Sequence, residues 1–376
     1  MNNEDDIILK ELIQKREAAL RGELNCIPFP FSSLRAYLPG IEQAKYICVT
    51  ANQKVGKTKF CDFTFVYETL FYTIAHPEVK AKILYFCLEE SAKKKRLDFY
   101  CHLLYRLDGI TISSTELSSI GKPVPENILN LLQSEKYMKY IQAFQEMVTF
   151  YDNIKHPTGI YKTCEEYALS QGHYNYETYI TKDPLGNPIQ KQKRNPITPY
   201  TSNNPSIYNI VIVDNASNLS YEANMSKMQT IERFSKYAVE LRNIFKFTII
   251  LIQHQAQAQE GIINTQAKRN KPTSDGLGDC KLVSRDISLL LGLYNPFKYN
   301  DNHYMGYDIK RLGNNTRFLE VLEDRNYGAN GAIIGLFFNG ASSYFKELPN
   351  PENAEQLQKI YSEVDKLKQK PSLILT

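Results

Sequence analysis

The stretch YICVTANQKVGKT, residues 46–58, decides the fold. Its first five residues are mostly β-branched or aromatic and predict a buried strand over 46–50. The segment ANQKVGKT (51–58) follows directly and leads into a helix expected over about 57–75. A loop that joins a strand to a helix N-terminus aims backbone N–H groups at a phosphate. The stretch therefore predicts a phosphate-binding loop, or P-loop.

Each position of this loop carries an expected role. Lys57 would neutralise the β- and γ-phosphate oxygens, the Thr58 hydroxyl would bind Mg²⁺, and Gly56 would let the backbone approach the phosphates. The loop departs from the pattern GxxxxGK[ST] only at its first position, Ala51. ATP and Mg²⁺ are the predicted cofactors. The residues expected to bind the nucleotide are Ala51, Asn52, Gln53, Lys54, Val55, Gly56, Lys57 and Thr58.

Short apolar runs alternate with helical stretches further along the chain. This alternation is typical of a mostly parallel sheet that helices cover on both faces. The runs that read as strands are 83–88, 210–214, 248–253 and 287–293, with helices expected over about 91–107 and 226–245. Three more runs, at 317–324, 331–340 and 343–348, follow one another through short loops. The expected fold class is α/β, a mostly parallel sheet flanked by helices with an antiparallel C-terminal extension.

Composition divides the chain into three parts. Residues 1–25 hold a charged amphipathic helix, residues 26–349 hold the predicted nucleotide-binding domain, and residues 350–376 hold a helical tail. We interpret the tail as folded back on its own domain rather than as a partner-binding stripe. Within the central part, residues 109–206 begin as a helical stretch and become polar and rich in Tyr, Asn and Pro. This composition predicts an insertion whose polar half, from Tyr151 onward, lies on the surface.

Charge and composition exclude several classes of protein. The 45 Lys and Arg residues against 41 Asp and Glu give a net charge of +4, too weak by itself to indicate a nucleic-acid or membrane partner. The seven cysteines include no CxxC pair, which argues against a zinc site and a disulfide framework. The acidic amino terminus is unlike a signal peptide, and no apolar run approaches the roughly 18 residues of a membrane span. We therefore expect a cytoplasmic protein with no membrane partner.

Acidic residues at the ends of two other strands complete the predicted site. Asp214 ends the run IVIVD, where a P-loop protein places the acid that holds Mg²⁺. The segment FCLEES places Glu89 at the end of the strand that follows the P-loop helix, where a carboxylate can polarise the attacking water. Its neighbour Glu90 is the alternative, which we read as a solvated residue of the next helix. Metal binding is thus assigned to Thr58 and Asp214, and catalysis to Glu89.

This ordered set of motifs resembles the RecA-like motor domain of the DnaB-type replicative helicases, of superfamily four. In that family the P-loop commonly begins with alanine, and CLEES (87–91) is similar to the family's SLEMS segment. The resemblance implies that Gln253, in IILIQHQ, senses the γ-phosphate and couples it to DNA-binding loops. It also implies that Arg325, in EDRNYG, is an arginine finger that reaches the γ-phosphate of a neighbouring subunit. The resemblance covers about 26–349 apart from the insertion, and it implies a RecA-like P-loop NTPase fold.

The function that the resemblance implies is an ATP-dependent single-stranded-DNA translocase, a DNA helicase that works as a homo-hexamer. A primase or a helicase loader would be a further partner. We expect this chain to lack the N-terminal domain that contacts primase in the family, and the helix at 5–20 to resemble the linker that docks on the adjacent subunit. Such a shortened form would suit a phage or a mobile element, and a phage protein would lie in the host cytoplasm.

Two rival functions stay open. The family has a lysine two residues before the arginine finger, whereas Glu323 stands here, which removes a positive charge and favours a RecA-like ATP-binding module that does not unwind DNA. A helicase loader or a recombination mediator would be such a module. The other rival is a structural or packaging protein with a vestigial ATPase fold, against which the intact set of site residues argues.

The loops after the Asp214 and Gln253 strands, about 215–226 and 255–285, are the segments that the resemblance turns toward DNA. The second loop carries a local excess of two positive charges, and its glycines would let backbone N–H groups approach phosphates. A solvated basic loop is the alternative. The DNA-binding candidates are Lys268, Arg269, Lys271, Gly276, Gly278 and Lys281.

Two other groups of side chains have a functional and a structural interpretation. Tyrosines of the insertion, near QKQKR (190–194), could stack on bases, but we interpret them as packing residues. His254, beside Gln253, could be taken for a general base, but we interpret it as a strand-end histidine held by a neighbouring backbone group. The tyrosines are Tyr174, Tyr176, Tyr179 and Tyr200.

Overall fold

A nine-stranded sheet runs through the computed structural model, which describes residues 3–278 and 280–369. The strand order is β17-β16-β15-β12-β3-β11-β10-β4-β5. The six strands from β12 to β5 are parallel to one another, whereas β15, β16 and β17 are antiparallel. The predicted fold class, including the antiparallel extension, is therefore confirmed.

Apart from β5, which was not predicted, the strands of this sheet match the apolar runs of the sequence to within about two residues at each end. The parallel strands are β3 (Tyr46–Ala51), β4 (Ala81–Cys87), β5 (Val148–Tyr151), β10 (Tyr208–Asp214), β11 (Thr248–His254) and β12 (Leu289–Tyr294). The antiparallel strands are β15 (Thr316–Asp324), β16 (Ile333–Asn339) and β17 (Tyr344–Glu347).

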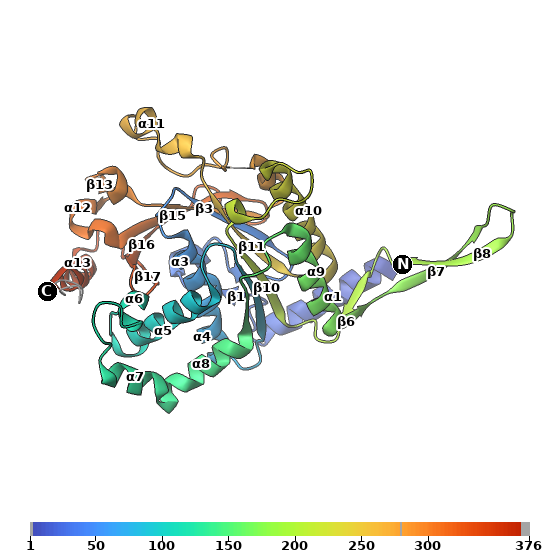
Figure 1. Cartoon of the computed structure of the whole chain (residues 1–376), viewed down its shortest axis with the longest axis horizontal. Helices are drawn as coiled ribbons and strands as arrows, with labels where there is room; N and C mark the ends of the chain where they lie inside the picture. Colours follow the sequence, from blue (N-terminus) through green and yellow to red (C-terminus); the bar gives the residue numbers. More distant parts are fainter. Residues whose placement is uncertain (1–2, 279, 370–376) are drawn as a thin grey trace.

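Helices cover both faces of the sheet (Figure 1). One face is covered by α3 (Lys57–Cys61), the π-helical segment η1 (Asp62–Tyr67), α4 (Glu68–Ala75), α5 (Ala92–Asp108), α6 (Ser114–Leu117), α7 (Glu126–Gln133) and α8 (Glu135–Met147). The other face is covered by α9 (Pro157–Ser170) and α10 (Lys227–Phe245). In β3, Ile47 and Val49 point to the first core, and Tyr46 and Cys48 to the second. Because both faces are buried, the central strands are continuously apolar rather than alternating.

The two terminal helices differ in their packing. The helix α13 (Ala354–Gln369) buries Leu357, Ile360 and Val364 in a third apolar cluster with α12 (Ile309–Leu312), so the C-terminal helix does fold back on its own domain. The helix α1 (Asn3–Leu20) instead leaves most of its apolar side chains exposed. Within the described residues, no helix combines the length and the apolar character that crossing a membrane requires.

The segment 109–206 is built into the domain more deeply than its composition predicts. The strand β5 extends the sheet beside β4, and α9 packs on α10 through buried Ile160, Cys164 and Ala168. The expectation that the chain runs over the surface from Tyr151 onward is therefore wrong up to the end of α9. The buried residues of α9 are spaced so that they lie on one face of the helix. The residues between them are mostly polar, so the composition of the segment did not indicate a buried helix.

The rest of this segment does project into solvent. A base formed by β6 (Gly172–Tyr174) and β9 (Tyr200–Ser202) carries a hairpin of β7 (Tyr176–Lys182) and β8 (Pro188–Arg194). Figure 1 shows this hairpin extending away from the body of the molecule. Smaller elements are β1 (Ile27–Pro28), α2 (Ser32–Arg35), β2 (Gly40–Ile41), α11 (Ile262–Gln266), β13 (His303–Tyr304) and β14 (Tyr307–Asp308).

Candidate active site

Four parallel strands end together at one edge of the sheet and bring the predicted site residues close to one another. Ala51 at the end of β3 pairs with His254 of β11, and Asp214 at the end of β10 pairs with Cys87 of β4. Glu89 follows β4 by two residues. Ligands of open α/β sheets bind outside the carboxyl ends of the strands, where such side chains converge. We call this side of the sheet the P-loop edge.

The P-loop encloses the ammonium group of Lys57. Its Nζ donates to the carbonyl oxygens of Ala51 (3.1 Å) and Asn52 (3.0 Å) and lies 2.9 Å from Nδ1 of His254. Burial lowers the pKa of Lys57 to about 8, although Asp214 and other acids oppose this shift. Gly56 has a φ of 102°, a left-handed conformation that glycine adopts without strain, and it caps the first turn of α3. The loop thus presents a helix N-terminus and a partly desolvated lysine to one place.

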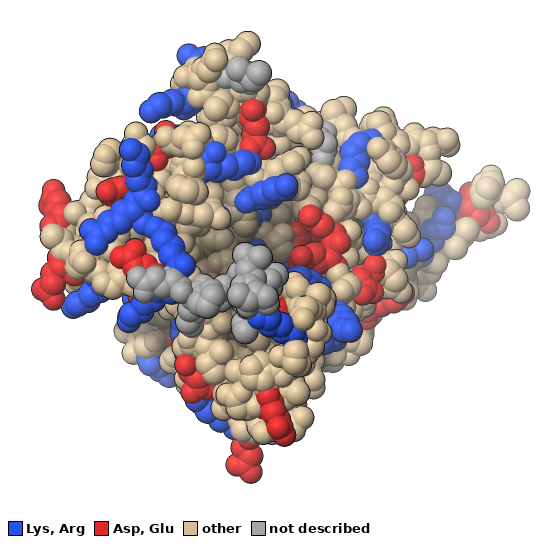
Figure 2. All heavy atoms as spheres, turned by 60° about the vertical axis from the view of Figure 1, so that its left-hand side comes forward, with Lys and Arg blue, Asp and Glu red and all other residues tan. Residues whose placement is uncertain are grey.

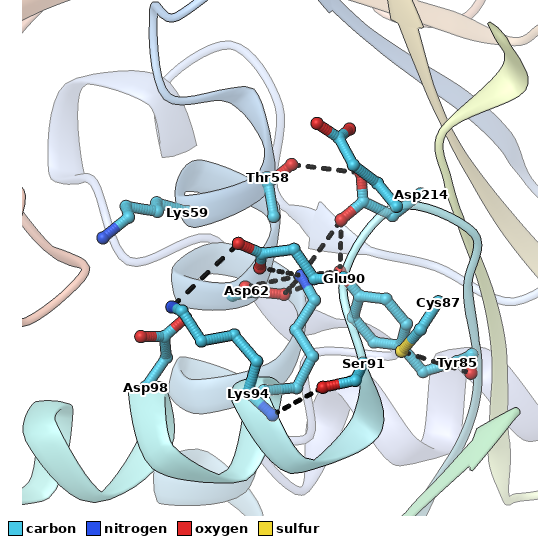
Figure 3. Close-up of polar contacts among 12 residues, drawn as sticks. Thr58, Lys59, Asp62, Tyr85, Cys87, Glu90, Ser91, Lys94, Asp98 and Asp214 are labelled. Carbon is cyan, nitrogen blue, oxygen red and sulfur yellow. Dashed lines mark hydrogen bonds and ion pairs between the residues drawn. The ribbon is translucent and has the colours of Figure 1, made fainter. Parts of the chain in front are cut away.

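Thr58 and Asp214 form a pair suited to a magnesium ion. The Thr58 hydroxyl donates to Oδ1 of Asp214 at 3.0 Å, as the close-up shows (Figure 3). A hydroxyl and a carboxylate are ligands that Mg²⁺ accepts, with phosphate and water oxygens in its other positions. Among residues 3–278 and 280–369, no group of three or more His, Cys, Asp or Glu side chains is arranged to hold a metal ion alone. The donor set therefore fits a Mg²⁺ ion that arrives with a nucleotide.

The two glutamates after β4 face different neighbours. Glu89 is exposed at the P-loop edge, and its Oε2 accepts a hydrogen bond from Nδ2 of Asn215. Desolvation, together with the negative charge of Asp214, raises the pKa of Glu89. Glu90 lies within 4.0 Å of the ammonium groups of Lys94 and Lys95 on α5. The position of Glu89 leaves it accessible to a water molecule at the P-loop edge, whereas Glu90 is turned to the helix.

Gln253 and His254 point to opposite sides of β11, because successive side chains of a strand alternate. Gln253 is fully buried, and its Nε2 donates to the carbonyl oxygens of Gly278 (3.3 Å) and Cys280 (3.1 Å). Gln253 thus faces away from the P-loop, contrary to the role that the resemblance implied. Because neighbouring residues of a strand point to opposite faces, the next residue, His254, contacts the P-loop instead.

His254 lies at the P-loop edge and points toward Lys57. Its Nδ1 contacts Lys57, and its Nε2 lies 3.3 Å from Nδ2 of Asn215, which also holds Glu89. The expectation of a backbone partner for His254 missed these two side chains. The sequence carried a signal for them, since His254 and Asn215 each follow a β-branched strand that ends at the P-loop edge.

A buried lysine behind Asp214 was missed altogether. Lys95 lies in the run KKKR on α5, which reads as a solvated face, yet its side chain is only 2% exposed. Its Nζ is 3.0 Å from Oδ2 of Asp214, 3.0 Å from Oδ2 of Asp62 and 2.7 Å from the hydroxyl of Tyr85. Figure 3 shows Asp62 and Tyr85 below Thr58, with Asp214 beside Thr58. Burial alone would lower the pKa of Lys95, but the two carboxylates raise it, so the ammonium stays charged.

A second buried cation, Arg317, supports the loop from the antiparallel side. Its Nε donates to the carbonyl oxygen of Val55 at 2.6 Å, and its guanidinium lies 4.6 Å from the ring centre of Phe338. Burial lowers the pKa of Arg317 to about 9. This residue fixes the middle of the P-loop through its backbone. Sequence reasoning missed it because Arg317 is the first residue of the run 317–324, whose other residues are apolar or acidic.

Arg325 lies at the opposite edge of the sheet. Its backbone N–H donates to the carbonyl of Ser288 (3.1 Å), and the N–H of Ser288 donates to Tyr46 at the start of β3 (2.7 Å). Its guanidinium donates to the carbonyl oxygens of Ser284 (3.1 Å) and Arg285 (2.5 Å). At roughly 3.3 Å per residue, the length of β3 separates the two edges by about 17 Å. Arg325 is therefore remote from the P-loop of its own chain.

Comparison with solved structures places this arrangement. The ATPase domain of G40P superposes with a TM-score of 0.61 over 92% of this chain and 98% of that chain, at 15% sequence identity. A DnaB-like replicative helicase, described with its interactions with primase, gives a TM-score of 0.60 at 14% identity over 89% of this chain. The chain has the fold of a DnaB-type RecA-like ATPase domain. It spans 65% of the length of that second helicase chain. No family model and no curated protein matches the sequence.

In this RecA-like domain the loop after β11 lies against the P-loop. Asn52 donates to the carbonyl of Asn270 (2.7 Å) and to the Tyr299 hydroxyl (2.6 Å), which in turn donates to Glu260 (2.7 Å). Lys298 donates to the backbone of the P-loop at 2.8 Å. The loop expected to face DNA is thus joined to the nucleotide side of the domain by side-chain hydrogen bonds.

The candidate DNA-binding residues of this loop fall into two groups. Lys268, Arg269, Lys271 and Lys281 are exposed. Gly276 and Gly278 are not available to a phosphate, because the N–H of Gly276 donates to Thr273 and the N–H of Gly278 donates to His254 (2.9 Å). A Cβ at Gly276 would lie 2.0 Å from Gln255, and a Cβ at Gly278 would lie 2.9 Å from the His254 carbonyl. These glycines serve close packing, so the expectation for their N–H groups is wrong.

The tyrosines of the insertion also divide. Tyr174 and Tyr200 pack against Phe245, with ring centres 5.8 Å and 5.0 Å away, so they are packing residues. Tyr176 and Tyr179 lie on the projecting hairpin and are exposed. The packing interpretation therefore holds for the base of the insertion and not for the hairpin.

Proposed function

We propose that this RecA-like domain is an ATP-dependent single-stranded-DNA translocase, a DNA helicase of the DnaB type. The observation that carries the proposal is the division of one catalytic set between two edges of the sheet. Lys57, Thr58, Asp214 and Glu89 lie at the P-loop edge, and Arg325 lies at the other. Such a set is complete only where the P-loop edge of one copy meets the opposite edge of another.

The residues at the P-loop edge supply the parts that phosphoryl transfer needs. Lys57 and the α3 N-terminus would hold the β- and γ-phosphates, and Thr58 and Asp214 would hold Mg²⁺, whose chemistry is to neutralise charge on the phosphate oxygens. Glu89 would accept a proton from the water that attacks the γ-phosphorus as the bond to ADP breaks. His254, rather than Gln253, is the side chain placed to respond to the γ-phosphate through Lys57 and Asn215.

Assembly of several copies is part of the proposal, with a homo-hexamer as the expected form. The helix α1 exposes Ile8 (49%), Leu12 (58%) and Ile13 (56%), an apolar surface that none of residues 3–278 and 280–369 buries. We propose that residues 1–25 act as a linker that packs on the adjacent copy, with 26–349 as the ATPase domain and 350–376 as its tail. A loader or a primase would be a further partner. We place the assembly in the cytoplasm.

Single-stranded DNA would contact the exposed basic side chains of the loop after β11. Four lysine and arginine side chains of this loop are exposed. Asn270 and Glu260 of the same loop join it to the P-loop by hydrogen bonds. Over the face drawn in Figure 2, basic and acidic side chains are interspersed. Since the described residues of this face form no single large basic patch, we expect DNA binding to depend on the few basic residues of the loop and to weaken as the salt concentration rises.

A second candidate function is an ATP-binding module without unwinding activity, such as a loader or a recombination mediator. The observation that favours it is Glu323, a half-buried carboxylate of β15 two residues before Arg325. A negative charge there weakens the positive potential that a finger needs. This module would bind ATP yet hydrolyse it slowly and without stimulation by DNA.

Steady-state ATPase and strand-displacement assays, with and without single-stranded DNA, separate the two functions. The helicase requires DNA-stimulated hydrolysis and displacement of a labelled strand. ATP binding with neither result would establish the second candidate instead. Negative-stain images with and without ATP test the assembly, since a translocase of this type requires a closed multi-subunit ring.

A further inference from the structure

Lys95 occupies an unusual place beneath the metal-binding pair. Its side chain, together with those of Asp62 (3%) and Asp214 (1%), is almost wholly buried. The lysine comes from α5 and the two acids come from η1 and β10, so the three charges join three different elements.

The ammonium group of Lys95 is fully used by its neighbours. An ammonium has three N–H donors. Its three close acceptors are Oδ2 of Asp62, the hydroxyl of Tyr85 and Oδ2 of Asp214, at 3.0, 2.7 and 3.0 Å. The Tyr85 hydroxyl in turn donates to Oδ1 of Asp62 at 2.8 Å. Asp62 and Tyr85 therefore accept two of the hydrogen bonds of Lys95, and the third goes to a single oxygen of Asp214.

The two oxygens of Asp214 are thereby given different tasks. Oδ2 is anchored in the core by Lys95, with Tyr85 3.2 Å away, while Oδ1 is directed to the Thr58 hydroxyl. A carboxylate that is free to rotate would exchange these oxygens. Removing ions from water is costly, and an apolar pair often fills the same space with no loss of stability. A charged pair at this point is thus better explained by what it does to Asp214 than by core packing.

We propose that Lys95 is a positioning residue for Asp214, and that Asp62 and Tyr85 position Lys95. By holding Oδ2, Lys95 keeps Oδ1 oriented toward the place where Mg²⁺ would enter with the nucleotide. Its positive charge also opposes binding of a cation by Asp214 in the absence of phosphate. The metal is then retained only together with a nucleotide. This inference rests on the proposed Mg²⁺–ATP chemistry of the same site.

The test uses a double variant that removes Lys95 together with Asp62, so that within the described residues the Asp214 carboxylate keeps only the hydroxyls of Thr58 and Tyr85 as hydrogen-bond partners. Asp62→Leu with Lys95→Met replaces both charges by apolar side chains of similar size. The control is Lys94→Met with Asp98→Leu, which removes the neighbouring ion pair of α5 and does not touch Asp214. Affinity for a fluorescent, non-hydrolysable ATP analogue is measured for each full-length protein in Mg²⁺ and in EDTA. The ratio of the two affinities reports the metal-dependent part of binding.

Loss of an outer-shell partner typically costs about 10–100-fold in metal affinity. We expect the Mg²⁺-dependent gain to fall by about 10-fold or more in the Asp62/Lys95 variant and to stay unchanged in the Lys94/Asp98 control. Affinity in EDTA should be equal in all proteins, since the P-loop itself is intact. An unchanged Mg²⁺-dependent gain in the Asp62/Lys95 variant would overturn the proposal and leave Lys95 a core residue.

Two single variants keep the test decisive if the double variant does not fold. Tyr85→Phe removes one hydroxyl from the network and should lower the Mg²⁺-dependent gain by a few-fold, whereas Tyr100→Phe, on the same helix as Lys95, should not. If Tyr85→Phe left the gain at the wild-type value, the positioning role would be excluded. A wild-type chain that bound the analogue equally in Mg²⁺ and EDTA would contradict the proposed function itself, a different result from either.

Discussion

The two edges of the central sheet are built in different ways. At the P-loop edge, polar side chains are buried and contact one another, and Lys57, Lys95 and Arg317 all lie within the protein. At the opposite edge, Arg325 is exposed, and its guanidinium donates to the backbone carbonyls of Ser284 and Arg285. The side chains of the first edge are held in place by one another, and the second edge presents an exposed cation that is remote from the P-loop of its own chain.

This difference indicates where catalysis would be controlled. A binding half that is complete within one chain can hold a nucleotide in an isolated copy. If Arg325 is an arginine finger, as proposed, it would contribute only after two copies meet, so hydrolysis would require assembly while binding would not. Variants at the two edges should therefore separate binding from turnover.

The largest effect is expected for Lys57→Ala at the P-loop edge. The change removes the ammonium group that faces the phosphates, and we expect no measurable binding of an ATP analogue and no hydrolysis. Lys59→Ala is the control, because Lys59 lies on the same helix and donates to the Gly340 carbonyl instead. Equilibrium binding by fluorescence anisotropy measures both. Normal binding by Lys57→Ala would show that the loop does not hold phosphates.

Arg325→Ala should keep binding and reduce hydrolysis by about 10³-fold or more, the range found for arginine fingers. Mixing this protein with Lys57→Ala after subunit exchange should restore part of the activity, because an intact P-loop edge of one chain can meet an intact Arg325 edge of another. Steady-state ATPase rates measure the rescue. The interfacial site would be refuted by an absence of rescue after demonstrated exchange, or by full hydrolysis in a dilute monomer.

Glu89→Gln should reduce turnover by about 10²-fold or more while ATP stays bound, because an amide cannot accept the proton of the attacking water. Glu90→Gln is the matched control, since Glu90 faces Lys94 and Lys95. Single-turnover hydrolysis with a binding assay distinguishes the two. Equal rates for Glu89→Gln and the parent would transfer the role to another acid.

The smallest expected effect concerns the pH dependence of the unfolding free energy. A histidine near the P-loop edge should contribute to it, and a histidine at the other edge should not. His102 is buried against Ser342 near the P-loop edge, and burial lowers its pKa to about 3, below the 6.5 of an exposed histidine. The unfolded chain therefore binds a proton that the folded chain excludes, and stability falls as the pH drops below 6.5. At pH 5 this amounts to about 2 kcal/mol of unfolding free energy. Urea titrations should show a weaker pH dependence in His102→Gln.

The control for this prediction lies at the other edge. His76 is exposed beyond the end of α4, just before β4 begins. His76→Gln should leave the pH dependence of stability between pH 7 and 5 as it is in the parent, within about 0.5 kcal/mol. A parallel change in both variants would mean that burial of His102 is not the cause.

Much of the fold could be predicted because its signals are local. A continuous apolar run predicts a strand buried on both faces, and GKT after such a run predicts the P-loop. Thr58 and Asp214 do lie side by side, as expected for strands that end at the same edge, while their role toward a metal stays a prediction.

What the sequence did not reveal depends on single positions and on contacts between distant elements. Gln253 and His254 are neighbours at the end of β11 and point to opposite faces of the sheet. The side chain that contacts the P-loop lysine is therefore His254 rather than Gln253. Lys95 reads as part of a basic, solvated helix face, because its partners Asp62 and Asp214 are 33 and 119 residues away in sequence. The strand β5 and the helix α9 are hidden in a polar segment whose few apolar residues are sufficient to pack.

The outermost strands of the sheet limit how copies can join. Both β5 and β17 have four residues, so each side offers few unpaired backbone groups to a strand from another chain. Lateral growth of this nine-stranded sheet between molecules is thereby disfavoured, which favours contacts between copies through helices, loops and strand ends. Interfaces of that kind can separate and re-form without opening a β-ladder. If the chain works as the proposed translocase, interfaces of this kind would let its subunits shift against one another during turnover.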